Sequence, residues 1–249
     1  MGEKTKRAIR VVALLPSAGQ GKRIGKGARK PFLTLGSRPI LAETIERIHS
    51  VSHITEIIPI IQERDMEYCL EGIVEKYGFH KIKRIAPGGH ERQDSVYNGL
   101  KLISPAADLV LIHDGVRPFI TGDLIEDVIR AAFENDGAVL AVPVKDTIKE
   151  ADRKGVVKRT LQRDNLWSIQ TPQVFHYNFM LEAYERAYRD NFYSTDDASL
   201  VERIGGNVKV IMGSYYNIKI TTPEDLLLGK IILSLQNKGD YADRKVQNL

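Results

Sequence analysis

The sequence predicts an α/β fold, in which a mostly parallel central sheet is flanked by helices. Two observations lead to this prediction: short runs rich in Val, Ile and Leu alternate with stretches of helical periodicity, and glycine or charged residues directly follow several of the apolar runs. Such alternation is typical of parallel sheets, because parallel strands need helical crossover connections. With 249 residues, 43% of them hydrophobic, the chain can build one such domain with a sizeable core.

The expected elements follow one another along the whole chain. Strands are expected at residues 10–15, 56–61, 81–86, 108–112, 138–142 and 207–211. Helices are expected at residues 40–51, 65–77, 93–102, 122–135, 177–188, 197–204 and 223–236. The polar segment 237–249 follows the last apolar helix, so we expect a flexible tail there.

One interval, residues 145–175, interrupts the alternation. It is charged and rich in turn residues, and it is too long for an ordinary connection in such a sheet. Long structured excursions are usually lids, binding loops or dimer arms. We expect a protruding β-hairpin arm, and a surface decoration is the plainer alternative.

The first expected strand runs into a loop suited to phosphate. Small residues follow it, namely Pro16, Ser17, Ala18, Gly19 and Gly21, and four cations come next, Lys22, Arg23, Lys26 and Lys30. Small residues let the backbone N–H groups approach anionic oxygens, and the cations add charge. The spacing does not match a Walker loop, and Ile24 stands where a dinucleotide fingerprint needs glycine. A glycine turn with a solvated basic face is the alternative.

Two further clusters follow expected strands. The first contains Gly89, His90 and Ser95 and precedes a helix, where a base or a ribose could bind. Ordinary helix capping would also account for its polar residues. The second contains Asp114 and Arg117 after a fully apolar run. Asp114 could contact Mg²⁺ or a substrate hydroxyl, and a plain ion pair with Arg117 is the competing interpretation.

Later groups add candidates for binding. Thr147 and Arg163 lie in the excursion, and Thr195 precedes an expected helix that it could simply cap. Lys219 lies between two isoleucines near a strand end, where a lysine either extends to the surface or faces a phosphate.

Composition excludes several classes of protein. The formal net charge of +4 comes from 36 basic and 32 acidic residues spread along the chain, which does not indicate a nucleic-acid-binding tail. No apolar run approaches the roughly 20 residues of a membrane span, and residues 1–10 lack the apolar region of a secretory signal. The single Cys69, expected to be buried, suits a reducing compartment such as the cytoplasm. The histidines form no zinc motif.

The pattern Pro-Ser-Ala-Gly-x-Gly-x-Arg, with a lysine seven residues after the arginine, resembles the signature loop of sugar nucleotidyltransferases. Further motifs occur in order: Gly-Gly-His-Glu-Arg-Gln-Asp-Ser-Val, His-Asp-Gly-Val-Arg-Pro, Val-Lys-Asp-Thr, Gln-Thr-Pro-Gln, Ser-Thr-Asp-Asp-Ala-Ser and Asn-Ile-Lys-Ile-Thr. Together they resemble the 2-C-methyl-D-erythritol 4-phosphate cytidylyltransferases from Val11 to Leu235. At Ser17 and His90 the chain departs from residues common in that family, Ala and Asp.

The resemblance implies a single Rossmann-like domain, homodimeric through the 145–175 arm, that binds CTP, a sugar-alcohol phosphate and Mg²⁺ or another divalent cation. The implied CTP-binding residues are Pro16, Ser17, Ala18, Gly19, Gly21, Lys22, Gly89, His90 and Ser95. The implied catalytic residues are Arg23, Lys30, Arg163 and Lys219. The implied substrate-binding residues are Asp114, Arg117, Thr195 and Lys219, with Thr147 and Arg163 supplied by the partner subunit. Asp114 is also a candidate metal contact, although the CTP phosphates would hold most of the metal.

The implied reaction needs no general base, because a phosphate monoester is already a nucleophile at neutral pH. Its oxygen attacks the α-phosphorus of CTP, and pyrophosphate leaves. Relief of charge repulsion and positioning are the main requirements. Two alternatives stay open: a cytidylyltransferase acting on ribitol 5-phosphate, and a non-catalytic nucleotide-binding regulator on the same fold.

Overall fold

A computed structural model describes residues 9–19 and 29–237. Within them, a seven-stranded sheet has the order β11-β7-β10-β6-β1-β4-β5, and all neighbouring strands are parallel except those that pair with β10. The strands are β1 (Val11–Pro16), β4 (Ile54–Ile61), β5 (Ala86–Pro87), β6 (Leu109–Ile112), β7 (Gly137–Pro143), β10 (Trp167–His176) and β11 (Val208–Met212). The predicted α/β class is therefore confirmed. The predicted strand at 81–86 is shorter than expected, with only β5 and an isolated bridge between Ile57 and Ile82.

Strand β10 corrects the predicted excursion of residues 145–175. Its second half lies in the middle of the sheet, antiparallel to both β6 and β7, so only the segment between β7 and β10 protrudes. The sequence pattern does not predict this strand, because it contains Pro172 and several polar residues, and prolines and buried polar groups are unusual in a central strand. In the fold the polar side chains have partners: Gln170 donates to the Ser214 carbonyl at 2.8 Å, and Thr171 contacts His113.

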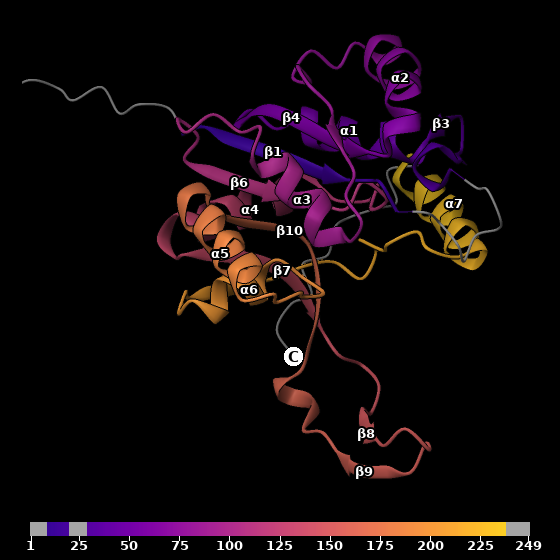
Figure 1. Ribbon diagram of the computed structural model, residues 1–249. Helices are drawn as coiled ribbons and strands as arrows, with labels where there is room; N and C mark the ends of the chain where they lie inside the picture. The colour runs from indigo at the N-terminus through magenta and orange to yellow at the C-terminus, as the bar shows by residue number, and fades with distance from the viewer. Residues whose placement is uncertain (1–8, 20–28, 238–249) are drawn as a thin grey trace, which may run out of the picture.

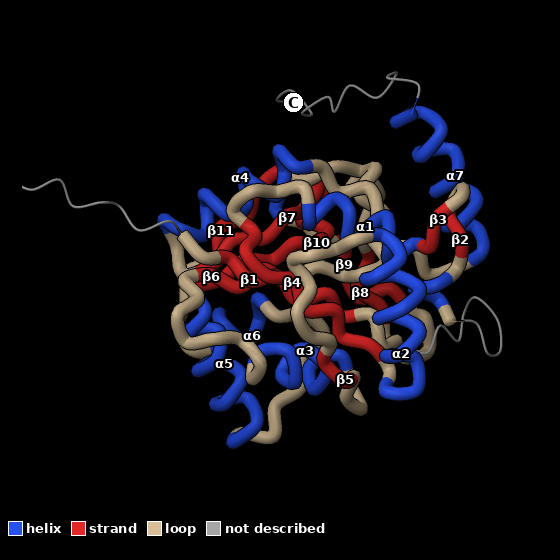
Figure 2. Tube along the Cα trace, turned by 90° about the horizontal axis from the view of Figure 1, so that it is seen from above, coloured by secondary structure: helices blue, strands red, loops and turns tan. Residues whose placement is uncertain are grey.

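Helices cover both faces of the sheet (Figure 2). On one face lie α1 (Ile40–His49) and α4 (Gly122–Glu134), and on the other lie α3 (Arg92–Leu100), α5 (Tyr177–Arg189) and α6 (Ala198–Arg203). Successive residues of β1 enter different cores: Val11 and Ala13 pack toward one face, Val12 and Leu14 toward the other. A strand buried on both faces reads as a continuous apolar run, which is why β1 was visible in the sequence.

The helical segment predicted at 65–77 is divided. It consists of a 3-10 turn (η2, Glu63–Asp65), one α-helical turn (α2, Met66–Cys69) and a π-helical segment (η3, Leu70–Glu75). Cys69 is fully buried, as expected, and burial raises the pKa of its thiol to about 12.

A smaller apolar cluster forms beside the main sheet. The last helix, α7 (Pro223–Asn237), packs against the hairpin of β2 (Thr34–Leu35) and β3 (Arg38–Pro39). This hairpin is not among the predicted strands. Gly36, with φ of 66°, makes the tight turn of this hairpin. The predicted tail begins where α7 ends, and residues 238–249 lie outside the described part of the chain.

The connection between β7 and β10 protrudes from the domain (Figure 1). It carries a two-stranded hairpin, β8 (Lys149–Ala151) and β9 (Val157–Thr160), followed by a short 3-10 turn (η4, Arg163–Asn165). We call residues 144–166 the arm. Among residues 9–19 and 29–237, no helix has both the length and the apolar character needed to cross a membrane.

Candidate functional site

A cleft of about 770 Å³ opens at the carboxyl edge of the parallel strands. The loops after β1, β4, β5 and β6 form its walls, which is where ligands bind in open α/β sheets. The segment after β11 closes one side with Lys219 and Thr221. Of the residues predicted for the site, those that line the cleft are Pro16, Ser17, Ala18, Gly19, Lys30, Gly89, His90, Ser95, Asp114 and Lys219.

One end of the cleft, the backbone end, is formed by the loops after β1 and β5. The Ser17 N–H donates to the Ile60 carbonyl at 2.8 Å, and the Gln62 amide donates to the Ala18 carbonyl at 2.7 Å. A Cβ atom at Gly88 would collide with the Ala18 side chain. The two loops therefore touch, and glycine is the residue that lets them approach so closely.

Ser95 holds the second of these loops in place. Its hydroxyl accepts a hydrogen bond from the Gly89 N–H at 2.9 Å and donates one to the Glu91 carbonyl at 3.0 Å. The His90 side chain, by contrast, is 93% exposed, and its Nδ1 atom lies 3.4 Å from the carboxylate of the neighbouring Glu91. This end of the cleft consequently offers mainly backbone groups, which can bind phosphate oxygens, a sugar or a base.

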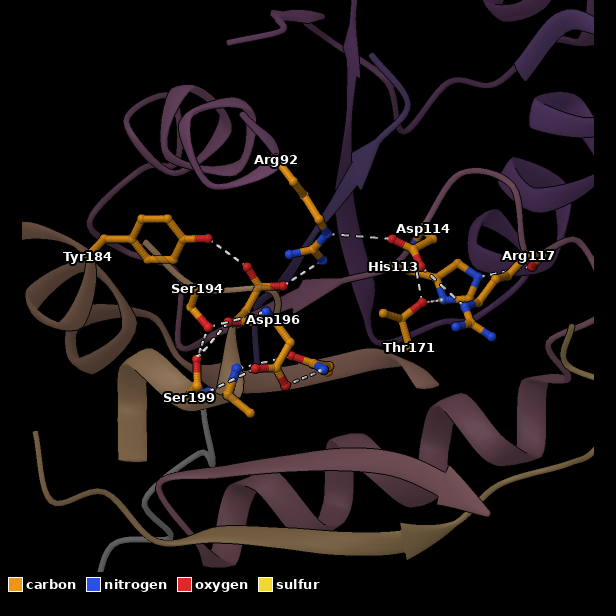
Figure 3. A network of polar contacts seen from close by, with 12 residues as sticks. Arg92, His113, Asp114, Arg117, Thr171, Tyr184, Ser194, Asp196 and Ser199 are labelled. Atoms are coloured by element: carbon orange, nitrogen blue, oxygen red, sulfur yellow. Dashed lines mark hydrogen bonds and ion pairs between the residues drawn. The ribbon is translucent and has the colours of Figure 1, made fainter. Parts of the chain in front are cut away.

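The opposite end, the charged end, is built around Asp114 (Figure 3). Its Oδ2 atom lies 3.0 Å from Lys219 Nζ and 3.2 Å from Arg117 Nε, and its Oδ1 atom lies 3.7 Å from Arg92 Nε. Burial alone would raise the pKa of Asp114, but Lys219, Arg92 and Arg117 outweigh it and hold that pKa well below its usual range. Arg92 also pairs with a second carboxylate, Asp197, so three cations face two carboxylates, and the one positive charge in surplus favours an anionic ligand.

His113 supports this cluster from below. The Arg117 carbonyl can only accept, so His113 Nε2–H donates to it at 3.0 Å, and Nδ1 accepts from the Thr171 hydroxyl at 3.0 Å. Thr171 in turn accepts the Asp114 backbone N–H at 3.0 Å. Burial lowers the pKa of His113 to about 4, so the ring is neutral at physiological pH. His113 is thus a structural residue that orders the backbone around Asp114 and Arg117.

Arg92 was not predicted, although it lies within the Gly-Gly-His-Glu-Arg motif. Its guanidinium donates to Asp197 Oδ2 at 2.7 Å and also faces Asp114. The Tyr184 hydroxyl donates to the other oxygen of Asp197 at 2.6 Å. Burial would lower the pKa of Arg92, but Asp197 and Asp114 raise it overall, so the charge is permanent. No sequence signal distinguished Arg92 from a helix-start residue.

Other cleft residues were missed for the same reason. Gln62, Glu63, Val116 and Thr221 line the cleft, and each simply follows a strand or precedes a helix in the sequence. Position at the carboxyl end of a strand was the one available signal, and it does not say which side chains face inward.

Some predicted residues lie elsewhere. Thr147 and Arg163 are exposed on the arm, where Arg163 donates to the Lys145 carbonyl at 2.8 Å, and neither lines the cleft. Thr195 is exposed in the loop before α6, and Asp196, not Thr195, accepts the Ser199 N–H there, at 3.3 Å. Gly21, Lys22 and Arg23 lie outside the described residues, so their predicted roles stay predictions.

Lys30 begins a short 3-10 turn (η1, Lys30–Phe32), with Pro31 as the next residue. Lys30 lines the cleft together with Ser17 and Gly19. Lys30, an implied catalytic residue, therefore lies at the cleft, and its role in catalysis stays a prediction.

Asp114 does not fit a direct metal ligand. Both of its oxygens face cations, and these would compete with a divalent ion for the same lone pairs. Within the described ranges, no group of three or more His, Cys, Asp or Glu side chains could hold a metal ion. The predicted Mg²⁺ stays a prediction, and no reaction step is derived through a protein-bound metal.

Comparison with known proteins gives consistent matches over most of the chain. The model of the 2-C-methyl-D-erythritol 4-phosphate cytidylyltransferase family matches residues 11–235. Proteins of that name from Alkaliphilus oremlandii and Geotalea uraniireducens are 47% and 48% identical, over 91% and 92% of this chain and 96% and 99% of their own lengths. The solved structure of 4-diphosphocytidyl-2C-methyl-D-erythritol synthase from Anaerococcus prevotii superimposes with a TM-score of 0.82 at 36% identity, covering 91% of this chain and 97% of that one.

Proposed function

The chain belongs to the 2-C-methyl-D-erythritol 4-phosphate cytidylyltransferase family, and we infer from this membership that it is a nucleotidyltransferase of isoprenoid biosynthesis. It transfers the CMP moiety of CTP to 2-C-methyl-D-erythritol 4-phosphate, giving 4-diphosphocytidyl-2-C-methyl-D-erythritol and pyrophosphate. The observation that best supports this activity is a single cleft with a backbone end at Gly88 and Gly89 and a charged end at Asp114. Such a cleft can hold a nucleotide and a second phosphorylated ligand next to each other.

We propose that CTP occupies the backbone end. Pro16, Ser17, Ala18 and Gly19 would follow the phosphates, and Gly89 would approach the base or the ribose. Ser95 would act mainly by fixing the Gly89 loop, because its hydroxyl is already engaged in two hydrogen bonds. The exposed His90 side chain contributes little to this proposed pocket.

The proposed chemistry is an in-line displacement. A phosphate oxygen of the sugar-alcohol phosphate forms a bond to the α-phosphorus of CTP, the bond to the bridging β-phosphate oxygen breaks, and pyrophosphate carries away the electron pair. Lys30 would stabilise the charge that develops on the α-phosphate, and so would Arg23, which lies outside the described residues. Donors aimed at developing charge typically contribute about 10²- to 10³-fold in rate.

The sugar-alcohol phosphate would occupy the charged end. Lys219, whose side chain is 39% exposed, is the cation that an entering phosphate would reach. Asp114 would hold Lys219 and Arg117 in place and could accept a substrate hydroxyl, since a carboxylate offers about four lone-pair sites. We further propose that Mg²⁺, or another divalent cation, accompanies CTP on its phosphate oxygens, where it would neutralise charge.

We also propose a homodimer in which the arm reaches the partner's cleft. The arm and its base expose Val156, Val157, Trp167 and Ile169 by 38% to 62% each, and such apolar exposure would be covered by a second copy. Thr147 and Arg163 would then meet the substrate of the other subunit. The proposed location is the cytoplasm, which supplies CTP and keeps thiols such as the buried Cys69 reduced.

The activity is tested by metal-dependent pyrophosphate release from CTP, with 2-C-methyl-D-erythritol 4-phosphate and ribitol 5-phosphate offered in parallel at matched concentrations. We expect a strong preference for the former, because the comparisons do not favour the ribitol substrate. Preference for ribitol 5-phosphate would move the enzyme to another pathway. No pyrophosphate release with either substrate would favour the non-catalytic regulator.

A further inference from the structure

Arg92 joins two buried carboxylates that belong to different parts of the fold (Figure 3). Asp114 follows β6 at the charged end of the cleft, and Asp197 precedes α6. Their side chains are only 7% and 1% exposed, and the guanidinium faces both, at 3.7 Å and 2.7 Å. Two such carboxylates would be costly to bury without a shared cation between them.

We propose that Arg92 is a positioning residue that sets the charged end of the cleft relative to the loop before α6, and thereby determines the affinity for the sugar-alcohol phosphate. The proposal rests on the activity inferred above. It goes beyond that activity by assigning a role to a side chain that need not touch the substrate itself.

The geometry requires an arginine and not merely a positive charge. Arg92 uses Nε toward Asp114 and Nη2 toward Asp197, and only a planar guanidinium presents donors in both directions at fixed spacing. The single ammonium of a lysine could serve one carboxylate well or both poorly. Because the Tyr184 hydroxyl holds the other oxygen of Asp197 at 2.6 Å, that carboxylate cannot simply turn to follow a shorter side chain.

The loop before α6 is tied to the same helix by a second contact. The Ser194 N–H donates to Gln93 Oε1 at 2.9 Å, so neighbouring residues at the start of α3 hold two points of this loop. Thr195, which is predicted to contact the substrate, lies between these two points. A change at Arg92 would therefore move Thr195 relative to Asp114.

Arg92 also determines how the two carboxylate oxygens of Asp114 are distributed among the three cations around it. It faces Oδ1, whereas Lys219 and Arg117 share Oδ2. Without the guanidinium, the carboxylate would be free to rotate and draw Lys219 away from the cleft. The backbone end is held by other groups, namely the Ser95 hydroxyl and the Asp94 carboxylate, which accepts the Glu91 N–H at 2.9 Å. The effect should consequently be confined to the sugar-alcohol phosphate.

The test is steady-state kinetics of Arg92→Lys with each substrate varied in turn. We expect the KM for 2-C-methyl-D-erythritol 4-phosphate to rise about tenfold or more, with the KM for CTP within about threefold of wild type. Asp197→Asn should reproduce this pattern, and the double variant should be little worse than either single one, because both remove the same bridge. Arg203→Lys is the matched control, because Arg203 forms an ion pair with Asp190 at an N–O distance of 2.8 Å and neither residue lines the cleft. This variant should leave both KM values unchanged.

Three results would overturn the proposal: an unchanged KM for the sugar-alcohol phosphate in Arg92→Lys, an equal rise of both KM values, or fully additive effects in the double variant. Thermal unfolding checks that each variant folds. If Arg92→Lys does not fold, Tyr184→Phe keeps every charge, removes one support of Asp197, and should still raise the KM for the sugar-alcohol phosphate alone. The wild type is assayed first, and its inactivity with that substrate would refute the proposed function instead.

Discussion

Acidification below about pH 6.5 should destabilise the protein through His113, which is completely buried beneath the charged end of the cleft. Both of its ring nitrogens are engaged: Nε2–H donates to the Arg117 carbonyl, and Nδ1 accepts from the Thr171 hydroxyl. Protonation of Nδ1 would place a second donor against that hydroxyl and would bury a charge. Lowering the pH should therefore destabilise the folded protein by protonating the His113 ring.

The magnitude follows from the pKa of His113 in the two states. Burial lowers this pKa from an ordinary value of 6.5 to about 4 in the folded protein. Between these values the unfolded chain binds a proton that the folded chain does not, so the free energy of unfolding falls as the pH falls. A gap of about 2.5 pH units, at about 1.36 kcal/mol per unit, amounts to roughly 3 kcal/mol by pH 4. Above pH 6.5 the contribution is fully retained.

Urea unfolding of the wild type and of His113→Gln, measured from about pH 7.5 to pH 4, provides the assay. Glutamine can still donate to the Arg117 carbonyl but cannot gain a proton. The difference in the free energy of unfolding between the two proteins therefore isolates the titration of His113, because the other titrating groups are common to both. Near pH 7.5 the wild type should be more stable by about 1–3 kcal/mol, because Thr171 loses its acceptor in the variant. At pH 4 this advantage should shrink by roughly 3 kcal/mol. A difference that stays constant with pH would refute the assigned tautomer and the neutral ring.

Three further predictions concern the cleft and the arm. Lys30→Ala should lower kcat by about 10²- to 10³-fold while the affinity for CTP stays within a few-fold, and near-normal turnover would contradict its role. Arg163→Ala should mainly weaken binding of the sugar-alcohol phosphate. Mixing this variant with Lys30→Ala should restore some activity, and no recovery would contradict an arm that acts on the partner subunit. Gly88→Ala places a Cβ against Ala18 and should raise the KM for CTP and cost about 1–3 kcal/mol of stability, whereas the control Gly122→Ala, with open space around its Cβ, should change neither.

The sequence alone was sufficient for the fold class and for much of the backbone end of the cleft. Strands such as β1 are buried on both faces, so their apolar runs were visible without knowing their neighbours. Residues that follow parallel strands must gather at one edge of the sheet, and Ser17, Gly89 and Asp114 were found there for that reason. The order of the motifs also indicated the family.

Only the tertiary structure showed that Arg92 and Asp197 join Asp114, Arg117 and Lys219 at the charged end. Strand β10 was hidden because its polar side chains find their partners far away in the sequence, as Thr171 does with His113, 58 residues apart. Arg92 looked like an ordinary helix start until the fold brought Asp114 and Asp197 to its two sides. Similarly, Asp114 was an acceptable metal ligand in the sequence, and the cations that occupy both of its oxygens come from three separate segments. Neighbours such as Asp114 and Arg117 can be paired from the sequence, but pairing between distant segments depends on distance in space, about which local sequence patterns carry no information.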